Sequence, residues 1–212
     1  MRKGSVSSNP PRVHSHFFPL SLAFLLGSLP FGFWLGRLKG VDVRRQGSGN
    51  IGATNVGRIL GRGWGYLVFA LDFCKGWLGV WVAREWGDPA DFWVVTAGLF
   101  AVLGHVFTPW VGFRGGKGVA TSAGVLLALT PVVGVLVAAV WGGAFLVSRI
   151  VSVASLLAAT AFPLLVHQLD PHRPALQWAA WVLALLVWVR HRDNLIRLFQ
   201  GKENGFKKKK PS

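Results

Sequence analysis

Residues 47–58, GSGNIGATNVGR, combine glycines with side chains that form hydrogen bonds. Glycine lets a backbone bend and approach a ligand in ways that other residues forbid. The hydrogen-bonding residues are Ser48, Asn50, Thr54 and Asn55, and Arg58 adds a planar cationic group. Apolar residues punctuate the stretch, which favours a folded segment over a flexible loop. We therefore predict a binding segment for an anion such as phosphate.

A second cationic stretch, GFRGGKG, occupies residues 112–118. It lacks the G-x-x-x-x-G-K-[ST] spacing of a P-loop, and no strand precedes it. The backbone amides of Gly115 and Gly116 could nevertheless cradle an anion. Arg114 and Lys117 add charge, and a helix that begins after the stretch would add its positive end. The alternative is a turn that is basic only because it faces the cytoplasm.

Two further stretches place polar residues at helical spacing. Ser148, Ser152 and Ser155 are four and three residues apart, so one helix would present them on one face. They could bind a ligand, or bond their own backbone and allow helices to pack closely. His191 and Asn194 also share a face, where they could hold a hydroxyl and steer a proton. A histidine in a basic run can equally be an ordinary surface residue.

Three ionisable residues lie inside apolar runs. Asp72 and Lys75 are three residues apart in LDFCKG, and His105 lies in the next run. Such residues are costly within a membrane and indicate function. We expect Asp72 to pair with Lys75 or to hold a cation from a neighbouring loop. We expect His105 to be hydrogen-bonded in the interior, and we predict no metal site.

Membrane helices must position all these residues. Of the 212 residues, 52% are hydrophobic and only 15% are charged, which is unusual for a soluble domain of this size. The apolar runs that could form membrane-spanning helices are 17–36, 64–83, 92–111, 119–147, 151–169 and 175–189. The net charge of +15 gathers between and after these runs, as the positive-inside rule predicts, so we do not expect nucleic acid as a partner. The fold class is therefore all-α, a polytopic membrane helix bundle.

Charge distribution predicts the topology of this bundle. Segments 37–62 and 112–118 and the C-terminal tail are basic and should be cytoplasmic, whereas segment 84–91 is acidic and should lie outside. The tail stays inside only if the run 119–147 is split, and Pro131 disfavours helix directly before it. We thus expect seven transmembrane helices, with the N-terminus outside and the C-terminus cytoplasmic.

The same reasoning divides the chain into three parts. Residues 1–15 are expected to be a disordered basic leader, because the apolar run that follows is too long for a signal peptide. Residues 16–200 would form the single transmembrane domain. Residues 201–212 would be a solvated, basic cytoplasmic tail.

Taken together, GSGNIGATNVGR, GHVFTPWVGFRGGKGVAT and HRDNLIRLFQGKE resemble the signature motifs of the bacterial acyl-phosphate:glycerol-3-phosphate acyltransferases. The resemblance covers about residues 20–205. It implies seven helices in the cell (inner) membrane and an active site on the cytoplasmic side. The implied reaction moves a fatty acyl group from acyl phosphate to the sn-1 hydroxyl of glycerol 3-phosphate. The products are 1-acyl-glycerol 3-phosphate (lysophosphatidate) and phosphate, and no cofactor is implied.

The resemblance also implies residue roles. The catalytic residues would be Ser48, Lys117, His191 and Asn194. The phosphate-binding residues would be Ser48, Asn50, Thr54, Asn55, Arg58, Arg114, Gly115, Gly116, Lys117, Ser152 and Ser155, with Asp72, Lys75 and His105 in support. The base would be His191 or a substrate phosphate oxygen, and the oxygen is favoured because nearby cations lower the basicity of His191. The partners would be both substrates, membrane lipid and, transiently, an enzyme that produces acyl phosphate.

Two other functions compete with this interpretation. Soluble acyltransferases carry a histidine followed four residues later by an aspartate, and none of His105, His167, His172 and His191 has that partner. A transporter of a phosphorylated solute would need related repeats in its two halves and a site near the midplane of the membrane. We find no convincing repeat, and the polar motifs gather at one predicted face.

Overall fold

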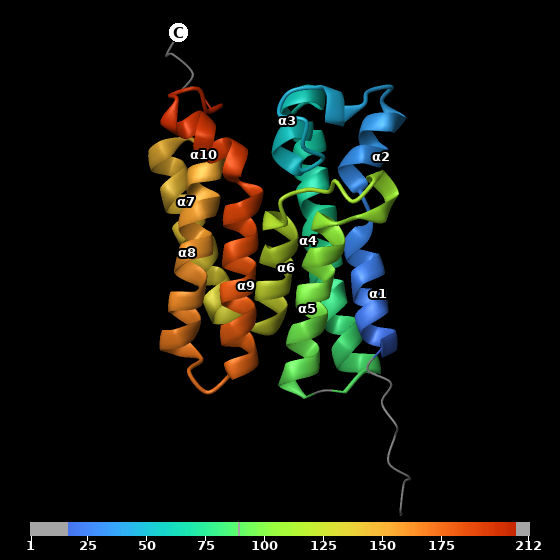
Figure 1. The fold of residues 1–212 in the computed structure, drawn as a ribbon, viewed down its shortest axis with the longest axis vertical. Coiled ribbons are helices and arrows are strands. Elements are labelled where there is room, and N and C mark those ends of the chain that lie inside the picture. Colours follow the sequence, from blue (N-terminus) through green and yellow to red (C-terminus); the bar gives the residue numbers. More distant parts are fainter. Residues whose placement is uncertain (1–16, 89, 207–212) are drawn as a thin grey trace, which may run out of the picture.

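The computed structural model describes residues 17–88 and 90–206, and every regular element in this part is helical (Figure 1). The predicted leader 1–15 lies outside the described residues. In chain order the helices are α1 (Phe17–Ser28), α2 (Phe31–Leu38), η1 (Val43–Arg45), α3 (Ala53–Leu60), α4 (Arg62–Trp86), α5 (Asp91–Val106), η2 (Pro109–Val111), α6 (Val119–Leu129), α7 (Pro131–Ser148), α8 (Val151–Leu169), α9 (Pro174–Arg190) and α10 (Arg192–Phe199). The all-α prediction is confirmed.

The helices form two groups with α6 between them (Figure 1). One group holds α1 to α5, and the other holds α7 to α10. Helix α6 packs on α4, α5 and α7, while α5 also contacts α9. A buried apolar cluster that includes Val102, Val125, Val166 and Leu176 joins the two groups.

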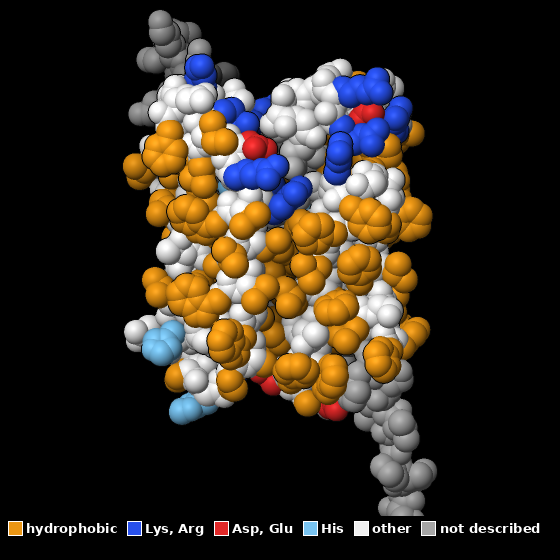
Figure 2. Space-filling view, in the orientation of Figure 1, with side chains coloured by type: hydrophobic (Ala, Val, Ile, Leu, Met, Phe, Trp, Pro, Cys, Tyr) orange, Lys and Arg blue, Asp and Glu red, His pale blue; other side chains and the backbone are white. Residues whose placement is uncertain are grey.

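Side-chain types divide the surface into zones (Figure 2). On the face shown, apolar side chains cover the middle, and Lys and Arg gather at the end that carries α3 and α10. Among the described residues, five segments are long and apolar enough to cross a membrane: Phe17–Leu38, Arg62–Trp86, Asp91–Val111, Pro131–Ser148 and Val151–Leu169. Helices α6 and α9 are shorter apolar helices. This is a membrane protein by length and composition; the count of seven crossings and the orientation stay predictions.

Small residues allow the helices to pack closely. A Cβ atom on Gly27 of α1 would collide with the Ala101 carbonyl of α5, and one on Gly76 of α4 would collide with the Thr121 carbonyl of α6. Backbones that approach this closely gain van der Waals contact, which is a main source of stability between helices in lipid. This packing fixes α5 and α6, the two helices that flank residues 112–118.

The predicted break near Pro131 is present. Helix α6 ends at Leu129, and α7 begins with Pro131. Arg173 donates to the Leu129 carbonyl (3.0 Å) and pairs with Asp91 (2.5 Å), while the Thr130 hydroxyl donates to Asp170 (2.6 Å). These contacts satisfy polar groups that the end of a short helix would otherwise leave unpaired.

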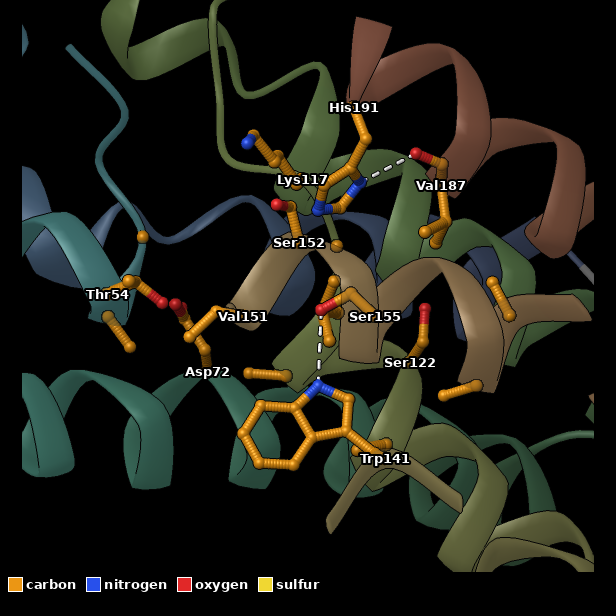
Figure 3. Close-up of a pocket in the computed structure, with 18 of the residues that line it drawn as sticks. Thr54, Asp72, Lys117, Ser122, Trp141, Val151, Ser152, Ser155, Val187 and His191 are labelled. Atoms are coloured by element: carbon orange, nitrogen blue, oxygen red, sulfur yellow. Dashed lines mark hydrogen bonds between the residues drawn. The ribbon is translucent and has the colours of Figure 1, made fainter. Parts of the chain in front are cut away.

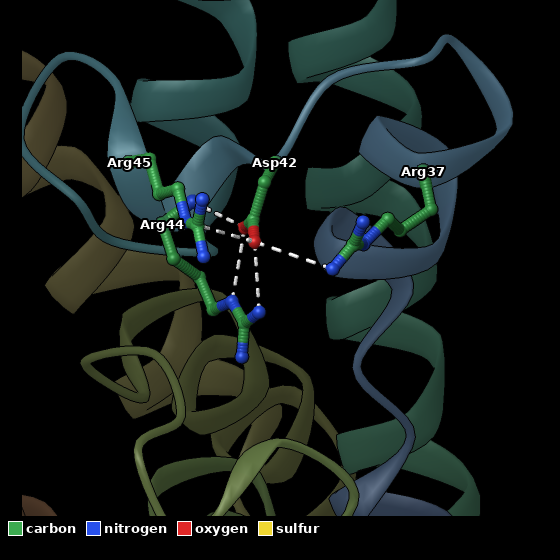
Figure 4. Close-up of polar contacts among 4 residues, drawn as sticks. All are labelled: Arg37, Asp42, Arg44 and Arg45. Carbon is green, nitrogen blue, oxygen red and sulfur yellow. Dashed lines mark hydrogen bonds and ion pairs between the residues drawn. The ribbon is translucent and has the colours of Figure 1, made fainter.

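The loop between α2 and α3 is organised around Asp42 (Figure 4). Its carboxylate accepts two hydrogen bonds from the Arg44 guanidinium (2.9 and 2.8 Å) and one from the Arg44 backbone amide. Arg37 and Arg45 lie 3.4 and 3.9 Å from the same carboxylate. The Arg44 hydrogen bonds hold the pKa of Asp42 well below its usual value. The loop that precedes residues 47–58 is therefore tied down at the basic end of the molecule.

Candidate active site

A cavity of about 300 Å³ opens at the basic end, among α3, α4, α6, α7, α8 and α9 (Figure 3). Its polar lining residues are Ser48, Asn50, Thr54, Asn55, Arg58, Asp72, His105, Lys117, Ser122, Ser152, Ser155, His191, Asn194 and Glu203. The deeper lining is apolar and includes Phe69, Leu126, Phe162 and Leu183. The four stretches singled out in the sequence therefore meet at one cavity that is polar at its mouth and apolar inside.

Lys117 lies in the cavity wall directly before α6. Its ammonium group donates a hydrogen bond to the Asn194 side-chain oxygen. Burial lowers the pKa of Lys117 to about 8. The residue next to it, Gly118, has a φ of 84°, which a residue with a side chain rarely adopts, and it turns the chain into the helix. Lys117 thus provides a partly desolvated positive charge at the N-terminus of α6, the end of a helix that favours an anion.

His191 lies between α9 and α10 and is 3% exposed. Its Nδ1 lies 2.8 Å from the Val187 carbonyl, which can only accept, so Nδ1 carries the proton and Nε2 is the acceptor. Burial, together with the charge of Lys117, lowers the pKa of His191 to about 4. The ring is neutral near pH 7 and is a weak base, in line with the sequence expectation that nearby cations reduce its basicity.

Glu203 is a site residue that the sequence reasoning missed. Its carboxylate accepts hydrogen bonds from Ser152 (3.0 Å), Asn194 (2.5 Å) and Arg197 (2.8 Å). Burial raises its pKa, but these three hydrogen bonds together outweigh that effect, and the net pKa is lowered. The signal was an isolated acid in an otherwise basic tail, at the end of the HRDNLIRLFQGKE motif.

Residues 201–206, the first part of the predicted solvated tail, contact the site although most of them are exposed. The Phe206 amide donates to the Arg149 carbonyl (2.9 Å), and Arg58 donates to the Asn204 carbonyl (2.9 Å). The Arg58 guanidinium also lies over the Phe206 ring, 5.6 Å from its centre. Arg58 therefore lines the cavity and anchors the tail. Residues 207–212 lie outside the described part.

Asn55 has a structural role in place of the predicted contact with phosphate. Its oxygen accepts from the Ser48 amide (2.9 Å), and its nitrogen donates to the carbonyls of Val43, Gln46 and Asn50 at 2.8 to 3.2 Å. The side chain is 2% exposed. These bonds occupy both N–H groups, the donors that a phosphate would need, so Asn55 shapes the loop that carries Ser48.

Three predictions for residues 112–118 are also wrong. The amides of Gly115 and Gly116 donate to the carbonyls of Val106 (3.0 Å) and His105 (3.3 Å), so they do not cradle an anion. Arg114 is exposed and does not line the cavity. The loop folds back on the end of α5, and only Lys117 of the predicted group faces the cavity.

The serines are divided between two helices. Ser148 ends α7, where its hydroxyl donates to the Ala144 carbonyl (2.7 Å), so it does not share a face with the other two. Ser152 and Ser155 belong to α8 and line the cavity. Ser152 donates to Glu203. Ser155 accepts from the Trp141 indole (3.2 Å) (Figure 3).

Asp72 and Lys75 form the predicted buried pair, 2.8 Å apart, and Lys75 also donates to the Leu29 carbonyl (2.7 Å). His105 is buried, with Nδ1 3.5 Å from the Asp72 carboxylate. A Cβ atom on Gly116 would collide with the His105 ring. The three residues thus support the base of the loop that carries Lys117.

Two more lining residues escaped the sequence reasoning. The Ser122 hydroxyl is buried, lines the cavity and has no hydrogen-bond partner in the described structure. Trp141 packs its ring against Phe145 at 5.2 Å while its indole reaches Ser155. Both lie in apolar stretches, where periodicity alone does not separate a residue that lines a cavity from one that contacts lipid.

The family model described as glycerol-3-phosphate acyltransferase matches residues 17–201. A glycerol-3-phosphate acyltransferase of Geobacter sulfurreducens is 46% identical over 187 residues, covering 88% of this chain and 95% of that protein. A glycerol-3-phosphate acyltransferase of Aquifex aeolicus is 45% identical over 191 residues, covering 89% of this chain and 98% of that protein.

Two solved structures of PlsY (YgiH), an integral membrane glycerol 3-phosphate acyltransferase, have the same fold. The glycerol 3-phosphate form is 42% identical with a TM-score of 0.86, over 91% of this chain and 96% of the other. The lysophosphatidic acid form is 41% identical with a TM-score of 0.83, over 91% of this chain and 95% of the other.

Proposed function

Since the chain belongs to the glycerol-3-phosphate acyltransferase family, we propose that it transfers a fatty acyl group from an acyl phosphate to the sn-1 hydroxyl of glycerol 3-phosphate. The products are 1-acyl-glycerol 3-phosphate and phosphate, and the reaction is the first acylation of phospholipid synthesis. The observation that carries the proposal is the two-part cavity, with cations at its mouth and apolar walls below. Such a cavity suits a donor with a phosphate head and an acyl tail.

The mouth holds the two phosphorylated groups. Lys117 and Arg58 supply positive charge, and Ser48 and Ser152 supply hydroxyls. His191 and Asn194 lie beside Lys117 and orient the glycerol hydroxyl. Asn194 and Ser152 are in turn held by Glu203, so the substrates meet a preorganised set of donors.

The chemistry needs few protein groups, because an acyl phosphate is already activated. The sn-1 oxygen attacks the acyl carbonyl carbon, and the new carbon–oxygen bond forms the ester. The bond between the acyl carbon and the phosphate oxygen breaks, and phosphate leaves with the electron pair. The hydroxyl proton passes to a phosphate oxygen, which is preferred over His191 because the pKa of His191 is only about 4. Positioning of the substrates and stabilisation of the developing charge by Lys117 accelerate the reaction.

The basic end of the molecule belongs on the cytoplasmic side of the inner membrane by the positive-inside rule (Figure 2). Both substrates then reach the cavity from the side on which glycerol 3-phosphate and the acyl phosphate are made. Transient contact with the enzyme that supplies the acyl phosphate fits this placement.

The test is phosphate release by purified, detergent-solubilised protein with palmitoyl phosphate and glycerol 3-phosphate. We expect release only with both substrates, together with lysophosphatidate. Palmitoyl-coenzyme A is the competing donor. Turnover with the thioester alone would refute the acyl phosphate donor, and inactivity of folded protein with both donors would refute the acyltransferase proposal for this chain.

A further inference from the structure

On four helices the lining of the cavity ends at an identifiable apolar residue or glycine. The deepest lining residues are Leu126 on α6, Gly134 on α7, Phe162 on α8 and Leu183 on α9. Beyond them on the same helices, Leu129, Val133, Val166 and Ala180 are buried. They belong to one packed apolar cluster and do not line the cavity. The cavity therefore has a closed floor.

Above the floor, the walls are built from small residues. Ala123, Ala138, Ala158 and Ala184 line the cavity on α6, α7, α8 and α9 respectively. Their short side chains leave the space that larger ones would fill. Alanines therefore line the walls, whereas Leu126, Phe162 and Leu183 at the floor have larger side chains.

Phe162 is the bulkiest side chain at this floor. It is 4% exposed and packs in the same cluster as Leu126 and Leu183. On α8 it follows the polar mouth residue Ser152 by ten positions, a rise of about 15 Å along the helix. An extended acyl chain whose head lies at Ser152 would meet the Phe162 ring with its far end.

From this geometry we propose that Phe162 sets the longest acyl chain that the enzyme transfers efficiently. The inference rests on the proposed function and adds chain length to it. A chain that stops short of Phe162 leaves part of the floor uncovered and loses apolar burial. A chain that is too long must displace the ring or bend, and overfilling a packed core is unfavourable. The balance of these two effects sets the longest acyl chain that is transferred efficiently.

The test compares dodecanoyl, palmitoyl and stearoyl phosphate as donors for the wild type and two variants. Phe162→Ala deepens the cavity, and we expect the kcat/KM ratio of stearoyl to dodecanoyl phosphate to rise about tenfold or more. Ala158→Leu raises the floor, and we expect the same ratio to fall by about tenfold. The second variant keeps the test decisive if Phe162→Ala does not fold.

Leu176→Ala is the matched control. Leu176 is 1% exposed and belongs to the same cluster, but it does not line the cavity. We expect it to lower the thermal midpoint without changing the length preference. A changed preference in this control, or an unchanged preference in both floor variants, would overturn the role of Phe162.

Thermal stabilisation by lysophosphatidates of the same three lengths separates this inference from the proposed function. Lysophosphatidate needs no donor, so its binding reports the cavity floor even if acyl phosphate proves to be the wrong donor. We expect the preferred length to shift with Phe162→Ala and Ala158→Leu in opposite directions. Identical length preferences in all proteins would refute the inference by themselves.

Discussion

Lys117 donates a hydrogen bond to Asn194 across the mouth of the cavity, although 77 residues separate them in the chain. The bond joins the loop before α6 to helix α10. The Asn194 side-chain nitrogen in turn donates a hydrogen bond to Glu203 in the tail. The position of the Lys117 charge therefore depends on the second half of the chain as well as on its own loop.

Removing the Lys117 charge should abolish most activity. We expect Lys117→Ala to lower kcat/KM by about a hundredfold or more, as for other groups that stabilise developing charge. Arg114→Ala is the control, because Arg114 is basic and close in sequence but is exposed and does not line the cavity. Phosphate release measures both variants. Equal losses in the two would mean that the overall basic charge, and not the position of Lys117, matters.

Activity should fall at alkaline pH because Lys117 must be charged to hold phosphate. Burial lowers its pKa to about 8, so kcat/KM should decline as pH rises through about 8, earlier than for an ordinary lysine. Lys117→Arg keeps its charge throughout this range and should lose that decline, even if its overall activity is lower. A pH profile from 6 to 10, roughly spanning the ordinary and shifted values, checks this. If kcat/KM of the arginine variant declines at the same alkaline pH as that of the wild type, the decline belongs to the titration of another group.

Asn55 should matter for stability as well as for activity. Asn55→Ala removes four hydrogen bonds from a buried position and should destabilise the protein by about 1–3 kcal/mol. Thr54→Ala is the comparison, since Thr54 lines the cavity without a hydrogen bond from its side chain in the described structure. It should lower activity at an unchanged thermal midpoint. A normal midpoint for Asn55→Ala would instead favour direct contact with the substrate.

Loss of Glu203 should loosen the mouth of the cavity. Glu203→Ala frees Ser152 and Asn194 and leaves Arg197 without its carboxylate. We expect a lower thermal midpoint and a raised KM for glycerol 3-phosphate, with a cost of about 2–4 kcal/mol for the lost charged hydrogen bonds. Glu85→Ala, at an exposed position on α4, is the control. A variant as stable and active as the control would show that the tail does not hold the site.

The sequence predicted the elements of the fold well because apolar runs and Pro131 act locally. A run of apolar residues favours a membrane helix wherever it lies, and a proline disfavours helix at the residue before it. The cavity residues Ser48, Arg58, Lys117 and His191 were found because polar residues stand out at the ends of such runs.

The errors concern contacts that form only when the chain folds back on itself. Whether the amides of Gly115 and Gly116 are free depends on the carbonyls of Val106 and His105, which only the folded loop brings close. Glu203 looked like part of a solvated tail because its partners are as distant as Ser152. Spacing along the chain carries no information about such contacts.

The fold of residues 201–206 over the mouth has a consequence for biosynthesis. A ribosome delivers α3, α6 and α8 long before it delivers Glu203 and Phe206, so the mouth of the cavity stays incomplete until the chain has been made through this segment. Catalytic competence should therefore arrive late, after the helices have entered the membrane. A nascent chain would be inserted and packed before it could consume an acyl phosphate.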